Sequence, residues 1–143
     1  MSSVLGRITE EDVRKQVRRF WETFCNKQAA ELGKYYGDGS VAFSVASLKP
    51  EPGRLSVARR AREYFQGEST LTVSTGPIDV VLLGNTAASA TYTFRFYASQ
   101  RAVGAEKKVE REIPSVRATQ VFRVNPDGDL QILQEHFSVA IQK

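Results

Sequence analysis

Residues 115–138 have the sequence SVRATQVFRVNPDGDLQILQEHFS, in which two runs of alternating apolar and polar residues flank Asn125-Pro126-Asp127-Gly128. Alternation with a period of two is typical of strands that bury one face, and Asn, Pro, Asp and Gly favour tight turns. The stretch therefore predicts a long β-hairpin near the end of this 143-residue chain.

Three helical patterns lie ahead of this hairpin. Thr9 and Asp12 have the spacing of a capping box, and the apolar residues that follow recur at helical intervals: Val13, Val17, Phe20, Trp21 and Phe24. A shorter helix is expected over residues 27–36, capped by Asn26. A third is expected from a cap at Ser56 to Gly67.

Alternating patterns predict further strands at 41–45, 71–73, 78–82 and 88–96. Residues 47–53 are expected to form a loop because Pro50 and Pro52 disrupt regular structure. Residues 99–114 are polar and charged, which predicts either an exposed loop or frayed hairpin ends.

Helices near the start, followed by consecutive antiparallel strands, indicate an α+β fold. We expect a curved antiparallel sheet of five or six strands wrapped around three helices, with a cavity inside. The length fits one domain, 1–143, in which residues 1–8 form a flexible N-terminal segment.

Composition limits the classes of function. The net charge of +4 arises partly from basic clusters at residues 14–19 and 54–62. We interpret these as solvated helix faces, because no nucleic-acid motif accompanies them.

No apolar run is long enough for a membrane span or a signal peptide. The single cysteine, Cys25, cannot form an internal disulfide and is expected to be a buried thiol rather than a reactive one. Together these features favour the cytoplasm.

Three segments carry a resemblance to a known family: Tyr35-Tyr36-Gly37-Asp38, residues 53–65, and the hairpin with its His136-Phe137-Ser138 ending. They resemble the SnoaL-like domains of the nuclear transport factor 2-like superfamily from Thr9 to Val139. Leu130 stands where that pattern often has tryptophan.

The resemblance implies a cone-shaped, cystatin-like fold with a pocket between helices and sheet, and a homodimer paired through the outer face of the sheet. The family includes ketosteroid isomerase-like enzymes, polyketide cyclases, dehydratases and non-catalytic assembly domains. Fold alone does not choose among these functions.

Isomerase chemistry needs a carboxylate base in an apolar pocket with hydrogen-bond donors nearby. In the isomerase-like relatives the resemblance places this base just after the second helix. Residues 41–45 contain no acid there. Asp38 lies close by, although a capping role in its turn is the simpler interpretation.

Strand alternation separates the remaining candidates. Placing Phe122 and Phe137 inward also places Gln120 and Glu135 inward, and it places Ile132 and His136 on the outer face. Glu135 is the first candidate for proton transfer, with Tyr36 or Tyr92 as the orienting donor. The alternative is a salt bridge from Glu135 to Arg95 or Arg117. His136, the only histidine, is expected to have a structural or interface role before a catalytic one.

The cone supplies aromatic side chains that could line a pocket for an apolar, ring-containing or acidic compound. The candidate ligand-binding residues are Trp21, Tyr36, Phe43, Tyr64, Tyr92, Phe94, Gln120, Phe122 and Phe137. We therefore expect a small-molecule-binding protein, with a metal-independent and cofactor-independent isomerase, cyclase or dehydratase as its enzymatic form. The alternative is a non-catalytic assembly module, whose cone would be filled by Trp21, Phe94 and Phe137.

Overall fold

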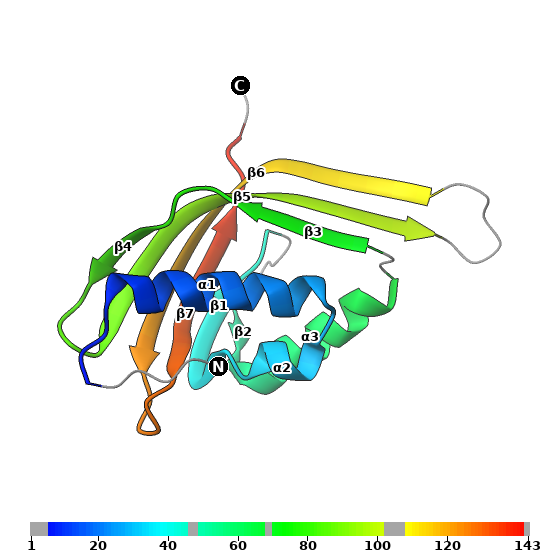
Figure 1. Ribbon diagram of the computed structural model, residues 1–143. Coiled ribbons are helices and arrows are strands. Elements are labelled where there is room, and N and C mark those ends of the chain that lie inside the picture. The colour runs from blue at the N-terminus through cyan, green and yellow to red at the C-terminus, as the bar shows by residue number, and fades with distance from the viewer. Residues whose placement is uncertain (1–5, 46–48, 68–69, 102–107, 142–143) are drawn as a thin grey trace.

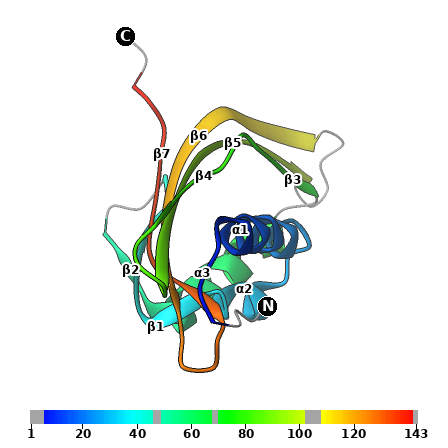
Figure 2. The same cartoon turned by 60° about the vertical axis from the view of Figure 1, so that its left-hand side comes forward.

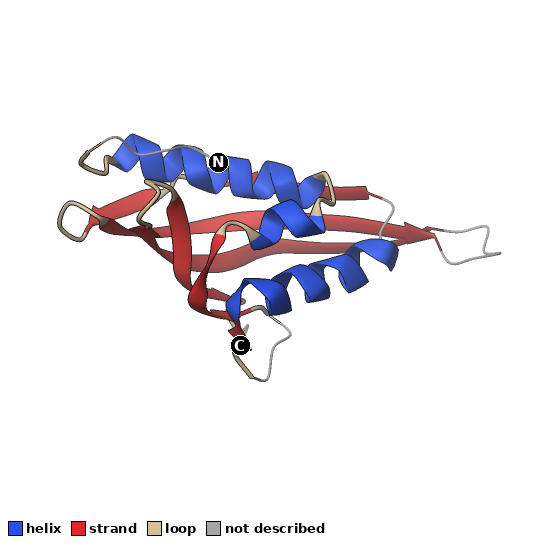
Figure 3. Ribbon diagram, turned by 90° about the horizontal axis from the view of Figure 1, so that it is seen from below, coloured by secondary structure: helices blue, strands red, loops and turns tan. Residues whose placement is uncertain are grey.

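The computed structural model describes residues 6–45, 49–67, 70–101 and 108–141. In this part of the chain a seven-stranded sheet curls around α1 (Glu10–Cys25), while α2 (Ala29–Gly33) and α3 (Gly53–Gly67) lie along its lower edge (Figures 1 and 2). All three helices lie on the same side of the strands (Figure 3). The α+β fold expected from the sequence is confirmed.

The sheet has the strand order β2-β1-β7-β6-β5-β3, with β4 paired to β5. Its strands are β1 (Tyr36–Phe43), β2 (Glu51–Pro52), β3 (Thr70–Thr75), β4 (Asp79–Leu82), β5 (Ala87–Arg101), β6 (Lys108–Val124) and β7 (Leu130–Ser138). The pairing of β1 with β7 is parallel. The sheet is therefore mixed rather than wholly antiparallel, which corrects the expectation from the sequence.

The terminal hairpin is the one that the sequence predicts. The side-chain oxygen of Asn125 accepts hydrogen bonds from the backbone N–H groups of Asp127 and Asp129. Gly128 has a positive φ of 86°, a conformation that glycine adopts without steric cost. The capping box of α1 is also present, with Thr9 and Asp12 each accepting from the other's backbone N–H.

The second helix is shorter than the pattern suggests. It ends at Gly33, and Tyr36 already belongs to β1. The backbone N–H of Ile132 donates to the carbonyl oxygen of Tyr35 at 2.7 Å, so β7 draws this segment into the sheet. Tertiary pairing here overrides a local helical pattern.

The third helix begins at Gly53 rather than after a cap at Ser56, whose hydroxyl donates instead to Glu51. Glu51 and Pro52 form a short strand in the expected loop, of which residues 47 and 48 lie outside the described residues. β5 and β6 extend as a long hairpin into the segment 99–114, where a loop or frayed ends were expected; residues 102–107 lie outside the described part. The expected flexibility of residues 1–8 concerns a segment of which only 6–8 are described.

A β-bulge at Leu133 changes the face on which the start of β7 packs. Val121 pairs with Gln134, but the next residue, Phe122, pairs with Ile132. Ile132 and Glu135 consequently both point inward, and Ile132 has no exposed surface. The assignment of Ile132 to the outer face was wrong, because it assumed uninterrupted alternation.

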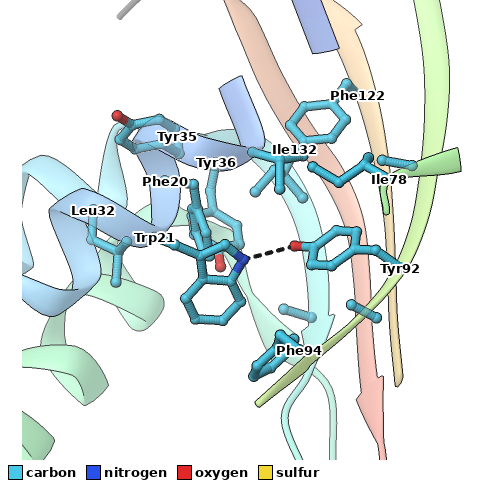
Figure 4. Packing of buried hydrophobic residues seen from close by; sticks show 14 of the residues in the cluster. Phe20, Trp21, Leu32, Tyr35, Tyr36, Ile78, Tyr92, Phe94, Phe122 and Ile132 are labelled. Atoms are coloured by element: carbon cyan, nitrogen blue, oxygen red, sulfur yellow. Dashed lines mark hydrogen bonds between the residues drawn. The ribbon is translucent and has the colours of Figure 1, made fainter. Parts of the chain in front are cut away.

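The core lies between α1 and the concave face of the sheet (Figure 4). Phe20 and Trp21 of α1 pack against residues of β1, β5 and β7. This layer of apolar side chains encloses the polar cluster described next.

Candidate functional site

Glu135 lies on β7, directly opposite Ala42 of β1 and Gln120 of β6, and only 5% of its surface is exposed. Its neighbour His136 points the other way and is exposed. The inward position of Glu135 and the outward position of His136 agree with the strand alternation expected from the sequence.

Two side chains hold the carboxyl group of Glu135. The hydroxyl of Tyr36 donates to Oε1 at 2.7 Å, and the amide Nε2 of Gln120 donates to Oε2 at 2.7 Å. The two arginines considered as salt-bridge partners of Glu135 bond to other residues: Arg95 pairs with Glu112, and Arg117 donates to the hydroxyl of Ser138. Glu135 is thus a buried carboxyl group held by neutral donors.

The hydrogen bonds continue away from Glu135 as a chain. Tyr92 donates its hydroxyl hydrogen to Oε1 of Gln120 at 2.6 Å. The indole Nε1–H of Trp21 donates in turn to the hydroxyl oxygen of Tyr92 at 2.9 Å, as the dashed line in Figure 4 shows. Helix α1 and strands β1, β5, β6 and β7 each contribute one member, and all five side chains are buried.

Burial dominates the acidity of this cluster. Loss of water raises the pKa of Glu135 to about 7, although the hydrogen bonds from Gln120 and Tyr36 oppose the rise. Burial and the nearby Glu135 charge raise the pKa of Tyr36, and burial raises that of Tyr92. A carboxyl group that titrates near neutral pH can both accept and release a proton there.

Three aromatic rings of the core contact one another. The rings of Trp21 and Phe94 lie 4.5 Å apart, Trp21 and Phe137 lie 5.6 Å apart, and Phe94 and Phe137 lie 5.3 Å apart. Phe137 lies two residues after Glu135, on the same face of β7, and is half-buried. The three rings that would fill the cone of an assembly module therefore contact one another.

Ser40 is a polar group that sequence reasoning missed. Its side chain is 1% exposed, and its hydroxyl has no hydrogen-bond partner among the described residues. Ser40 shares the inward face of β1 with Ala42, the residue opposite Glu135. No signal in the sequence distinguishes it, because the bulge between Tyr36 and Val41 decides which residues of β1 face inward.

The other candidates lie apart from this cluster. The side chain of Asp38 is 91% exposed and pairs with Arg54. Phe43 lies on the outer face, with its ring 5.4 Å from that of His136, so the structure does not place it inside the cone. Tyr64 of α3 stacks near Phe24, and Phe122 is fully buried core.

The outer face of the sheet carries a hollow of about 790 Å³. Asp79, Thr93, Arg117, Thr119 and His136 are among its lining residues. A second hollow of about 460 Å³ lies at α3. Neither is lined by Glu135 or Gln120.

The described residues include no group of three or more His, Cys, Asp and Glu side chains placed to hold a metal ion. Within the described ranges, no helix has the length and apolar character that crossing a membrane requires.

No protein-family model matches the sequence, and no curated protein matches it either. Solved structures do match. A nuclear transport factor 2-like superfamily protein from Salmonella enterica serovar Typhimurium superimposes with a TM-score of 0.75 at 17% identity, over 92% of this chain and 91% of that one.

Two further structures are similar. One is a protein from Catenulispora acidiphila in complex with S-DNPA, with a TM-score of 0.73 and 15% identity over 90% of each chain. The other is a proposed calcium/calmodulin-dependent protein kinase II association domain from Xanthomonas campestris, with a TM-score of 0.74 and 14% identity over 100% of this chain and 99% of that one. The chain thus has the fold of the nuclear transport factor 2-like superfamily, as the resemblance in its sequence implies.

Proposed function

We propose that the protein binds a small apolar, ring-containing or acidic compound inside its cone and that Glu135 transfers a proton to or from it. The observation that carries this proposal is the buried Glu135 carboxyl group, held by two directed donors and brought to a pKa of about 7. Burying an ionisable group costs free energy, and such groups gather at functional sites.

The surroundings of Glu135 suggest the class of reaction. Glu135 is buried in the core that also holds the contacting rings of Trp21, Phe94 and Phe137. A base in such surroundings suits the removal of a proton from carbon beside an activating group, as in isomerisation, cyclisation or dehydration. Phe137 is half-buried and follows Glu135 on the inner face, so we propose that its ring moves when a ligand enters. A protein of the same fold forms a complex with S-DNPA, which supports ligand binding.

The ligand can be sought by native mass spectrometry of the purified protein, which retains a co-purified compound. With that compound as substrate, Glu135→Gln is expected to lower turnover by about 10²–10⁴-fold, the usual contribution of a general base. The change keeps the shape of the side chain and removes its proton-accepting charge. Glu112→Gln, on the exposed part of β6, serves as the control. Unchanged turnover in Glu135→Gln would exclude this role.

An assembly module is the second candidate function. It is favoured by the mutual contacts of Trp21, Phe94 and Phe137, the three rings expected to fill the cone of such a module. A proposed association domain has the same fold. On this account the protein pairs with a second copy, and the cone contributes stability rather than binding.

For either function we propose a homodimer formed through the outer face of the sheet, in a cytoplasmic protein. The strand registers align one row of outward residues across four neighbouring pairs of strands: Val81, Ser89, Val121, Gln134 and Val41. Asp79 and Arg117 line the adjoining hollow, so a two-fold axis can bring the carboxylate of one copy toward the guanidinium of the other.

Val121→Asp is expected to dissociate this dimer, because it places a carboxylate in the centre of the paired faces. Analytical ultracentrifugation should then show a 15.9 kDa species in place of one twice that mass. Val109→Asp is the matched control, since Val109 lies on the same strand but near the far end of the β5–β6 hairpin and is 55% exposed. A wild-type protein that sediments only at 15.9 kDa at micromolar concentration would contradict the dimer.

A further inference from the structure

The hydrogen-bond chain that ends at Glu135 has a fixed beginning. An indole nitrogen can only donate, so the Nε1–H of Trp21 must meet a lone pair on the Tyr92 oxygen. The hydroxyl hydrogen of Tyr92 is then free to point at its other partner, Oε1 of Gln120. The identity of residue 21 therefore decides which atom of Tyr92 faces Gln120.

The same logic fixes the amide of Gln120. Because its oxygen accepts from Tyr92, its NH₂ group faces Oε2 of Glu135. If the amide were turned over, its NH₂ would face Tyr92, and the Tyr92 hydroxyl hydrogen would have to point at the N–H of Trp21. Two donors would then face each other in a buried site, where an unsatisfied polar group is costly.

The orientation of the Gln120 amide affects which protonation state of Glu135 is stable. An ionised carboxylate only accepts hydrogen bonds, whereas a protonated carboxyl group must also donate one. The hydroxyl of Tyr36 can rotate to accept that proton, but the amide of Gln120 is held with its donor side toward Glu135. By donating to Oε2, the amide stabilises the ionised form of Glu135, whereas burial destabilises that form.

We propose that Trp21 is a positioning residue that acts through Tyr92 and Gln120 to hold Glu135 in its proton-accepting form. Trp21 does so from the opposite end of this hydrogen-bond chain of Trp21, Tyr92, Gln120 and Glu135, which we call the relay. It makes no hydrogen bond to Glu135 itself. The use of this arrangement in catalysis rests on the proposed function. The direction of the relay does not, since it belongs to the unliganded protein.

The test is to measure the pKa of Glu135 in the unliganded protein. A pH titration monitored by ¹³C NMR of its side-chain carboxyl group gives this value. Trp21→Phe removes the indole donor and allows the relay to reverse, so the pKa of Glu135 is expected to rise by about one pH unit. Tyr92→Phe removes a single oxygen and is expected to give a rise of the same sign. It serves as the second variant if Trp21→Phe does not fold.

Phe94→Leu is the matched control. The Phe94 ring lies 4.5 Å from that of Trp21 and has no polar atom, so the variant disturbs the packing and leaves the relay intact. The pKa of Glu135 should stay at its wild-type value in this variant. An unchanged pKa in both Trp21→Phe and Tyr92→Phe, or an equal rise in Phe94→Leu, would overturn the proposal. Because no ligand is used, a protein that proves to lack catalytic activity would contradict the proposed function and leave this inference standing.

Discussion

Replacing Glu135 with Gln is expected to remove about 3 kcal/mol of pH dependence from the free energy of unfolding, between pH 4.5 and about pH 8. The pKa of Glu135 is raised to about 7 in the folded protein, from an ordinary value of 4.5. The folded state therefore holds the proton more tightly than the unfolded state does. The contribution of Glu135 to stability is therefore fully present below pH 4.5, falls as the pH rises through 7, and is level above about pH 8.

The measurement is urea denaturation of the wild-type protein and of Glu135→Gln at a series of pH values. The difference between the two unfolding free energies is the informative quantity, because contributions from other titrating groups cancel in it. Glu135→Gln should gain stability relative to wild type as the pH rises. Glu112→Gln, which changes a half-exposed carboxylate, should follow the wild-type curve. A constant difference between Glu135→Gln and wild type would show that Glu135 titrates normally.

Ile132→Asp is expected to unfold the protein or to cost more than about 4 kcal/mol, because it places a charge at a position with no exposed surface. Val109→Asp is the control: it lies near the far end of the β5–β6 hairpin, outside the proposed dimer face, and is 55% exposed, where substitutions usually change stability by about 0.5 kcal/mol or less. Circular dichroism and urea denaturation distinguish the two variants.

This pair of variants tests the bulge at Leu133. If β7 alternated without interruption, Ile132 would lie on the outer face beside Gln134. Ile132→Asp would then fold normally and change only the oligomeric state, which would contradict the register described above.

The parts of the fold that the sequence predicts are those that local patterns determine. The capping box at Thr9 and the turn from Asn125 to Gly128 depend on residues close together in the chain, and both are present. The parallel pairing of β1 with β7 joins segments about a hundred residues apart. No local pattern encodes that pairing, and it is the reason that Tyr36 leaves the expected helix.

The candidate site shows the same division. Alternation along β6 and β7 predicts that Gln120 and Glu135 face inward, and it also predicts that His136 faces outward. The function of Trp21 as a donor could not be predicted, since its apolar spacing on α1 indicates only a core position. Its contact with Tyr92 depends on how closely the curved sheet approaches α1, which is a property of the assembled fold.

The pKa of Glu135 in the unliganded wild-type protein tests the central claim most directly. A ¹³C NMR titration of glutamate side-chain carboxyl groups, with the Glu135 signal assigned by its absence from Glu135→Gln, measures this value alone. The account predicts a midpoint near pH 7, because burial outweighs the two donated hydrogen bonds. A midpoint at or below 4.5, the ordinary value for glutamate, would show that the carboxylate is fully ionised at neutral pH and would contradict its proposed use as a proton-transfer group.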